Sequence, residues 1–240
     1  MAKLILLSIL ILFLHSVSGQ TSRNVKGSGY VLTQQRETDY FHSIIVSRNI
    51  SVAIVQGELQ PLTVEADNNL FPYIKTVVRN GILKIYISDS INITKYADLN
   101  VLISMPTLRS LTAYQHSQID GSPQIWKIPS IQIKASENSQ IKLHLETENI
   151  EVDGRTSAII ELKGKTQNLK TTLKTSASLK AKDLETIRAE IALATAAKAE
   201  IKVASQLSYE LAGNVRLILY GTPAITKSQL TSGSKLIWKK

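Results

Sequence analysis

Apolar residues recur about every 18 or 19 residues through the second half of the chain, and they do so in two parallel columns. The first column contains Ile141, Ile160, Leu179, Ala197 and Val215, and the second contains Leu143, Leu162, Ala181, Ala199 and Leu217. Successive numbers in both columns differ by 19, 19, 18 and 18. Two apolar columns in one register indicate a solenoid, in which each coil stacks only on its neighbours. We therefore expect an all-β, β-helix-like solenoid with about 18 or 19 residues per coil.

Polar corners punctuate the same repeat at residues 147–150, 166–169 and 184–187. Their Thr, Asn and Glu side chains can bond to local backbone groups where the chain turns between faces. An antiparallel sandwich would instead require hairpin turns built on Gly or Pro, and neither residue occurs between Gly164 and Gly213. The corners favour the solenoid.

The segment Ile187 to Ser205 tests this interpretation because its Ala, Glu and Lys content favours a helix. Its apolar residues nevertheless alternate with period two, whereas a helical stripe through Ile187 and Ile191 would run into Lys198. We predict strand here, with inward side chains at Ile191, Leu193, Ala197, Ala199 and Ile201.

The first half of the mature chain is also predicted to be β-structure, but without a regular repeat. Asn80-Gly81 lies between two alternating apolar runs and is a strong hairpin signal. Strand spacing becomes regular near Met105. The expected division is a signal peptide at 1–19, a leader at 20–29, an irregular β half at 30–104 and a solenoid half at 105–240.

The N-terminus has the pattern of an export signal. Lys3 precedes an apolar run that is shorter than the roughly 20 residues a membrane span requires, and small residues follow before Gln20. The chain contains no cysteine, so neither disulfides nor a lipidated cysteine are expected. We expect an exported protein without a membrane span, located in the periplasm, on the cell surface or in the medium.

Several segments together resemble one known family. They are Gln56-Gly57-Glu58, the run LTVEADNNLFPYIKTVVRNGILKIYI, Ala212-Gly213-Asn214-Val215 and Tyr220-Gly221-Thr222-Pro223. The resemblance, over roughly Ser28 to Lys235, is to the DUF2807 family, the putative auto-transporter adhesin head GIN domain. It implies an exported protein of a Bacteroidetes-type bacterium with an all-β, β-helix-like fold. It supplies no catalytic residues.

The residues that usually carry chemistry are scattered. His42, His116 and His144 lack metal-ligand spacing, so no metal or other cofactor is expected. Asp120 and Asp153 each precede a glycine and suit turns, and they do not share a coil position with Asp183. We expect no catalytic residues and no enzyme activity. The alternatives are a carbohydrate-active enzyme on a β-helix and a purely structural envelope component.

Net charge directs attention to one outward position of the repeat. The formal charge of +9 falls by one when Lys3 leaves with the signal, and an exported basic protein meets anionic glycans or lipids rather than nucleic acid. The same steps that define the apolar columns place Lys142, Glu161, Lys180, Lys198 and Arg216 in one outward column, with Lys163 and Lys182 two positions along. Solvated lysines are the simplest interpretation. The functional hypothesis is an adhesin-like binding module in which these cations hold an anionic glycan or lipopolysaccharide, with any protein partner unknown. The candidate binding residues are Lys142, Lys163, Lys180, Lys182, Lys198 and Arg216.

Overall fold

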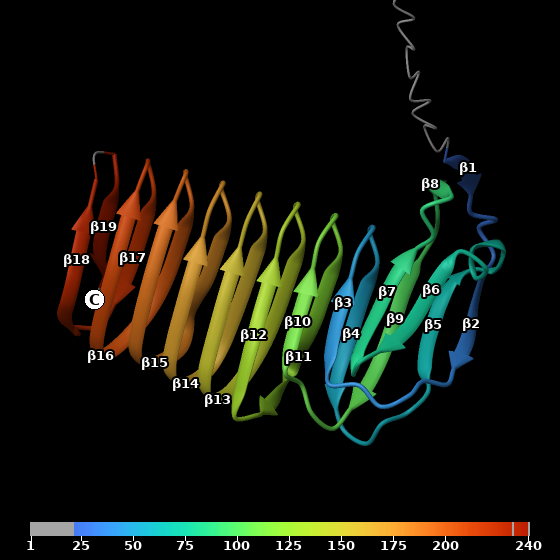
Figure 1. Ribbon diagram of the computed structural model, residues 1–240, viewed down its shortest axis with the longest axis horizontal. Coiled ribbons are helices and arrows are strands. Elements are labelled where there is room, and N and C mark those ends of the chain that lie inside the picture. Colours follow the sequence, from blue (N-terminus) through green and yellow to red (C-terminus); the bar gives the residue numbers. More distant parts are fainter. Residues whose placement is uncertain (1–21, 232, 240) are drawn as a thin grey trace, which may run out of the picture.

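The computed structural model describes residues 22–231 and 233–239, so the expected signal peptide at 1–19 lies outside the described residues. Figure 1 shows a curled sheet at the N-terminal end, followed by a long stack of β-coils. The only helical segment described is a single 3-10 turn, η1 (Asn68–Leu70). Across the described ranges, no helix has the length and apolar character needed to cross a membrane. The strands are β1 (Arg23–Lys26), β2 (Val31–Arg36), β3 (Ser43–Val46), β4 (Ser51–Gln56), β5 (Leu62–Asp67), β6 (Ile74–Arg79), β7 (Ile82–Ile87), β8 (Ile91–Lys95), β9 (Leu99–Met105), β10 (Ser110–Ala113), β11 (Gln118–Lys127), β12 (Ser130–Ala135), β13 (Gln140–Gly154), β14 (Ile159–Leu173), β15 (Ser178–Ala194), β16 (Lys198–Ala212), β17 (Arg216–Tyr220), β18 (Ala224–Leu230) and β19 (Lys235–Lys239).

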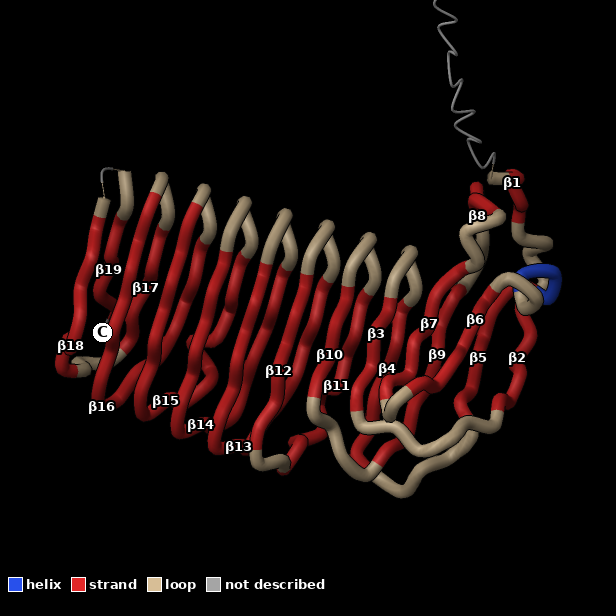
Figure 2. Tube along the Cα trace, viewed as in Figure 1, coloured by secondary structure: helices blue, strands red, loops and turns tan. Residues whose placement is uncertain are grey.

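Each coil has an ascending strand, a tight tip and a descending strand (Figure 2). Ascending strands pair in parallel with ascending strands, as β10 does with β3 and β12, and descending strands do the same, as β11 does with β4 and β13. The long strands β13 to β16 each contain a descending strand, a corner and the next ascending strand. The all-β solenoid expected from the sequence is confirmed.

The tips are built from two consecutive residues in the left-handed region. Among the described residues the pairs are Arg48-Asn49, Gln115-His116, Glu137-Asn138, Thr156-Ser157, Thr175-Ser176, Thr195-Ala196 and Gly213-Asn214. The next residue is small at most tips and turns inward, as Ala158, Ala177 and Ala197 do, each fully buried. Successive tips are joined by backbone bonds, such as Ser157 N–H to Thr175 O at 2.9 Å. Six of these seven pairs contain no glycine, which is why the sequence lacks the usual hairpin signal over most of the stack.

The inward columns are buried as expected, but their register is wrong beyond Leu179. Ile141 pairs with Ile160 and Ile160 with Leu179, after which Leu179 pairs with Ala199 and Ala199 with Leu217. The coil from Leu179 to Ala199 is therefore longer than its neighbours. It contains a β-bulge, where Lys182 and Asp183 are both exposed and the register shifts on either side. Ala197 belongs to the tip column, together with Ala158 and Ala177.

The segment Ile187 to Ser205 is strand on both sides of one tip, as predicted. β15 ends at Ala194 and β16 begins at Lys198, with the turn between them. All five residues predicted to face inward are buried. Ile187, in contrast, is 36% exposed, because the corner in this coil is Thr186-Ile187-Arg188 and Ala189 takes the inward position.

The first half contains more of the solenoid than the expected boundary near residue 105 implies. β3 and β4 form the first coil, since they pair in parallel with β10 and β11. On their other side they pair with β7 and β9, which leads into the curled sheet. The Asn80-Gly81 hairpin between β6 and β7 forms as predicted. Within the expected leader, β1 pairs in parallel with β8, so this part of the chain joins the fold.

Candidate functional site

Strand pairing divides the six candidate cations among several rows, where a row is the set of residues opposite one another on successive strands. Lys142 and Lys180 share one outward row of the descending sheet, and Lys198 and Arg216 share another. The longer coil separates them, because Lys180 pairs with Glu200 and not with Lys198. The expected run of three cations at Lys180, Lys198 and Arg216 is therefore incorrect.

The row that contains Lys142 and Lys180 alternates in charge. Its members in order are Asp120, Lys142, Glu161, Lys180 and Glu200. Adjacent parallel strands lie roughly 4.8 Å apart, so each lysine has a carboxylate on both sides. Opposite charges at neighbouring positions stabilise a sheet modestly. We call this set the alternating row, and its charges compensate one another.

The row that contains Lys198 and Arg216 has the opposite character. Lys198 pairs with Arg216 on β17, and Arg216 pairs with Lys235 on β19. All three residues are exposed, and the same row upstream carries uncharged Ser178, Ile159 and Gln140. We call Lys198, Arg216 and Lys235 the cationic row. Sequence reasoning missed Lys235, although it stands one coil length after Arg216 in the sequence.

The two remaining candidates lie apart from the cationic row. Lys163 is opposite His144 on β13, and Lys182 lies in the bulge of β15 next to Asp183. Further along the same strands, Lys202 faces Glu185 and ion-pairs with it at 3.7 Å. Lys142, Lys180 and Lys202 thus lie opposite carboxylates, whereas Lys198, Arg216 and Lys235 lie opposite one another.

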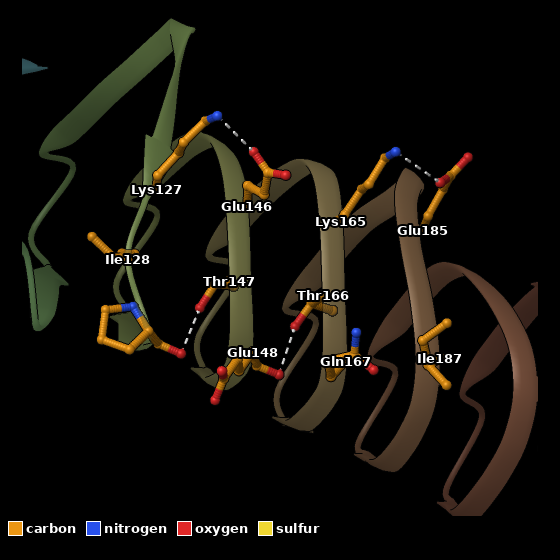
Figure 3. Close-up of a pocket in the computed structure, with 11 residues that line it drawn as sticks. Lys127, Ile128, Glu146, Thr147, Glu148, Lys165, Thr166, Gln167, Glu185 and Ile187 are labelled. Carbon is orange, nitrogen blue, oxygen red and sulfur yellow. Dashed lines mark hydrogen bonds and ion pairs between the residues drawn. The ribbon is translucent and has the colours of Figure 1, made fainter.

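A groove of about 550 Å³ runs along the corners of four coils (Figure 3). Lys127 and Glu146 face each other across adjacent strands at 3.3 Å, and Lys165 and Glu185 do so at 3.9 Å. Below these pairs, the hydroxyl of Thr147 donates to Pro129 O at 3.0 Å. Thr166 donates to Glu148 O in the same way, at 3.2 Å. Figure 3 shows the two Lys–Glu pairs in the upper part of the view and Thr147 and Thr166 below them.

The groove offers little unsatisfied chemistry. Lys127, Glu146, Lys165 and Glu185 are ion-paired, and the hydroxyls of Thr147 and Thr166 are used for backbone carbonyls. A general acid on a glycan-cleaving enzyme is usually kept protonated by burial, whereas the side chains of Glu146 and Glu185 are 53% and 58% exposed. This arrangement suits corner stabilisation better than proton transfer.

Ion pairs also stabilise the ascending sheet, on the other side of the molecule. Hydrogen bonding to Asp153 raises the pKa of Arg155, and hydrogen bonding to Glu210 raises the pKa of Lys227. The Lys227–Glu210 pair joins neighbouring coils, and the Arg155–Asp153 pair lies at the base of a tip. Both pairs face solvent. Among the residues with described placement, no three His, Cys, Asp or Glu side chains gather as a metal site.

Comparison with solved structures shows that the fold recurs. A putative adhesin from Bacteroides fragilis NCTC 9343 superposes with a TM-score of 0.80 at 15% identity, covering 89% of this chain and 97% of that one. A putative adhesin from Parabacteroides merdae ATCC 43184 gives 0.75 at 15% identity, covering 91% and 100%. A structure described as a putative lipid binding protein from Parabacteroides distasonis ATCC 8503 gives 0.69 at 17% identity, covering 91% and 100%.

The family comparison covers most of the chain, from the start of the first coil to the end of β17. No curated protein sequence matches. The family model described as "Putative auto-transporter adhesin, head GIN domain" matches residues 40–223. Given this match, the protein belongs to the DUF2807 family.

Proposed function

We propose that this protein is an exported, non-enzymatic binding module of the bacterial cell envelope that holds an anionic polymer on the descending sheet. Two lines of support exist: family membership among adhesin-like proteins, and the distribution of charge over the coils. The ligand class is an acidic polysaccharide or the anionic core of lipopolysaccharide. Nucleic acid is not the expected partner, because an exported protein rarely meets it.

The cationic row is the observation that carries the proposal. Lys198, Arg216 and Lys235 lie on three successive strands, so the backbone holds like charges close together. Like charges directly opposite each other cost a sheet about 0.2–1 kcal/mol per pair. The alternating row shows that this sheet elsewhere balances its charges. An anionic polymer lying across the coils would contact all three cations and remove the repulsion.

The flat descending sheet suits a polymer better than a small molecule. The outward residues next to the cations are Ile218 and Ile237, with Tyr220 further along, and all three are half-buried. Aliphatic and aromatic side chains beside cations can pack on the apolar faces of sugar rings or on lipid chains. A structural relative described as a putative lipid binding protein is consistent with a lipid-containing ligand such as lipopolysaccharide.

The test is a binding screen of the mature protein against acidic polysaccharides, neutral polysaccharides and lipopolysaccharide at two salt concentrations. We expect binding to an anionic member that weakens at the higher salt, because screening shortens the reach of exposed charges. Lys198→Glu combined with Arg216→Glu should abolish it. The matched control is Lys75→Glu with Lys174→Glu, which changes the same net charge at exposed positions outside this sheet.

Two results would contradict the proposal. One is undiminished binding by the Lys198→Glu and Arg216→Glu protein. The other is the absence of binding to every anionic polymer at low salt, which would favour a purely structural envelope component. Hydrolysis of a polysaccharide during the screen, lost on Glu146→Gln, would favour the enzyme alternative through the corner groove.

A further inference from the structure

The C-terminal end of the solenoid is open within the described residues. β18 pairs only with β16, and β19 pairs only with β17, so the outer edge of each strand has no partner. Inward rows that are buried in the preceding coil become exposed here: Leu230 is 48% exposed and Trp238 is 49% exposed, whereas Leu211 and Leu219 are buried. Solenoids usually end in a coil with a polar outer face. We call β18 and β19 the open end.

The free edge of β19 presents the same backbone groups that join the other coils. The N–H of Lys235 donates to Val215 O at 2.9 Å, and the N–H of Arg216 donates to Ala197 O at 3.1 Å. Successive residues of a strand direct their backbone groups to opposite sides. Leu236 and Trp238 therefore direct their N–H and C=O groups away from β17. An extended segment could form backbone hydrogen bonds with these groups, as the next strand does elsewhere in the stack.

Charge at the open end selects the kind of strand that can be added. Lys235 is the last residue of the cationic row. Lys239 is the last residue of a second row, whose members in order are Lys127, Glu146, Lys165, Glu185, Lys202, Tyr220 and Lys239. A residue added opposite either lysine meets a cation on the sheet. Carboxylates at these two positions would be attracted, and cations would be repelled.

A second copy of this chain does not meet that requirement. Two-fold pairing of β19 with itself, centred on Ile237, would place Lys235 opposite Lys239 of the other copy. At the other end of the molecule, β2 and β6 carry Arg36, Lys75 and Arg79 and contain no acidic residue. Lysine at an edge strand opposes self-association, and here it also favours an acidic partner.

We propose that the open end binds an extended acidic segment of a partner protein, which adds to β19 as a further strand. The segment carries carboxylates at positions i and i+4, opposite Lys235 and Lys239, and apolar residues at i+1 and i+3, over Leu236 and Trp238. The pattern is symmetric, so it applies to parallel and antiparallel addition. This inference rests on the free edge of β19 and not on the anionic polymer proposed for the sheet face, although Lys235 belongs to both sites.

The test uses a synthetic nonapeptide whose central residues are Glu-Leu-Thr-Val-Glu, and a scrambled peptide of the same composition. We expect the full chain to bind the first peptide at least ten times more tightly than the scrambled one. Lys235→Glu with Lys239→Glu should lose that binding and gain binding to a peptide with Lys-Leu-Thr-Val-Lys at its centre. Lys75→Glu with Lys174→Glu is the control and should bind as the wild type does.

Hydrogen exchange distinguishes strand addition from simple charge attraction. On peptide binding, the amides of Leu236 and Trp238 should exchange more slowly, while that of Ile237, which faces β17, should change little. Failure of the wild type to bind the acidic peptide would overturn the proposal. So would equal binding of the scrambled peptide, or unchanged exchange at Leu236 and Trp238 in the bound state, which would indicate an anion site without an added strand. None of these outcomes depends on whether a polysaccharide binds.

Discussion

At the scale of single residues, most of the described tips turn the chain without glycine. Thr195 and Ala196 adopt the left-handed region, and Ala197 then enters the interior with no exposed surface. A left-handed residue with a Cβ costs roughly 1–2 kcal/mol. Bonds between successive tips, such as Ser176 N–H to Thr195 O at 2.9 Å, offset that cost in each coil. The inward residue is small at most tips, as Ala197 is, and the neighbouring tips stack directly on it.

Ala197→Glu tests this packing. The variant places a carboxylate in a closed tip column, between the buried side chains of Ala177 and Val215. We expect the free energy of unfolding to fall by about 3 kcal/mol or more, from burial of an unpaired charge and from overpacking. The measurement is equilibrium denaturation in urea.

Ala196→Glu is the matched control, because Ala196 is adjacent in sequence but exposed. It should change the free energy of unfolding by less than about 1 kcal/mol, as surface substitutions usually do. Equal losses in the two variants would contradict the inward orientation of Ala197.

At the scale of strands, the pairing of charges distinguishes the alternating row from the cationic row. Glu161 lies between Lys142 and Lys180, whereas Arg216 lies between Lys198 and Lys235. Both positions are on the outer face of the same sheet. Both rows run through the coils on either side of the bulge in β15, so they differ in the residues that they carry and not in where they lie. The bulge changes the sequence spacing from one coil to the next, and Lys198 therefore pairs with Ser178 and not with Lys180.

Charge reversal at the two central positions should have opposite effects on stability. Arg216→Glu should raise the free energy of unfolding by about 0.5 kcal/mol, because two repulsive contacts become attractive. Glu161→Lys should lower it by a similar amount for the converse reason. Urea denaturation at low salt measures both, and the two differences should shrink as salt is added. A change of the same sign in both variants would contradict the assigned register.

The same bulge marks the limit of what the sequence could predict. Period-two alternation identified the strands and the five inward residues of Ile187 to Ser205, because burial on one face leaves a local pattern. The order of rows beyond Leu179 could not be predicted, because Lys182 and Asp183 are two exposed residues that no local signal identifies as a bulge. The residues predicted for the two columns are nevertheless buried, because Ala197 faces inward at the tip and Ala199 faces inward on the strand.

The candidate site could be predicted only in part for the same reason. The sequence identified Lys198 and Arg216 as neighbours, and the structure pairs them. It also grouped them with Lys180, which in fact faces Glu200. Lys235 was not predicted, because the expected outward column ended at Arg216. A small register error is therefore enough to turn an alternating row into an apparent cationic one.

At the scale of the whole molecule, the coils form an extended platform with different properties along its length. The curled sheet closes the N-terminal end, where Arg36 of β2 bonds to Ile74 O at 2.7 Å and thereby connects two edge strands. The middle coils carry compensated charges. The last coils carry the cationic row and the open end. Function is therefore expected at the C-terminal third of the solenoid.

The most direct measurement of this account compares two neutralised pairs in binding to the best anionic polymer from the screen. Lys198→Gln with Arg216→Gln removes two charges from the cationic row, and Lys142→Gln with Lys180→Gln removes two from the alternating row of the same sheet. Both proteins have the same net charge. We predict that the first pair loses at least ten-fold in affinity at low salt and that the second pair binds as the wild type does. Equal losses in both proteins would show that binding follows net charge alone, and would contradict a site at the cationic row.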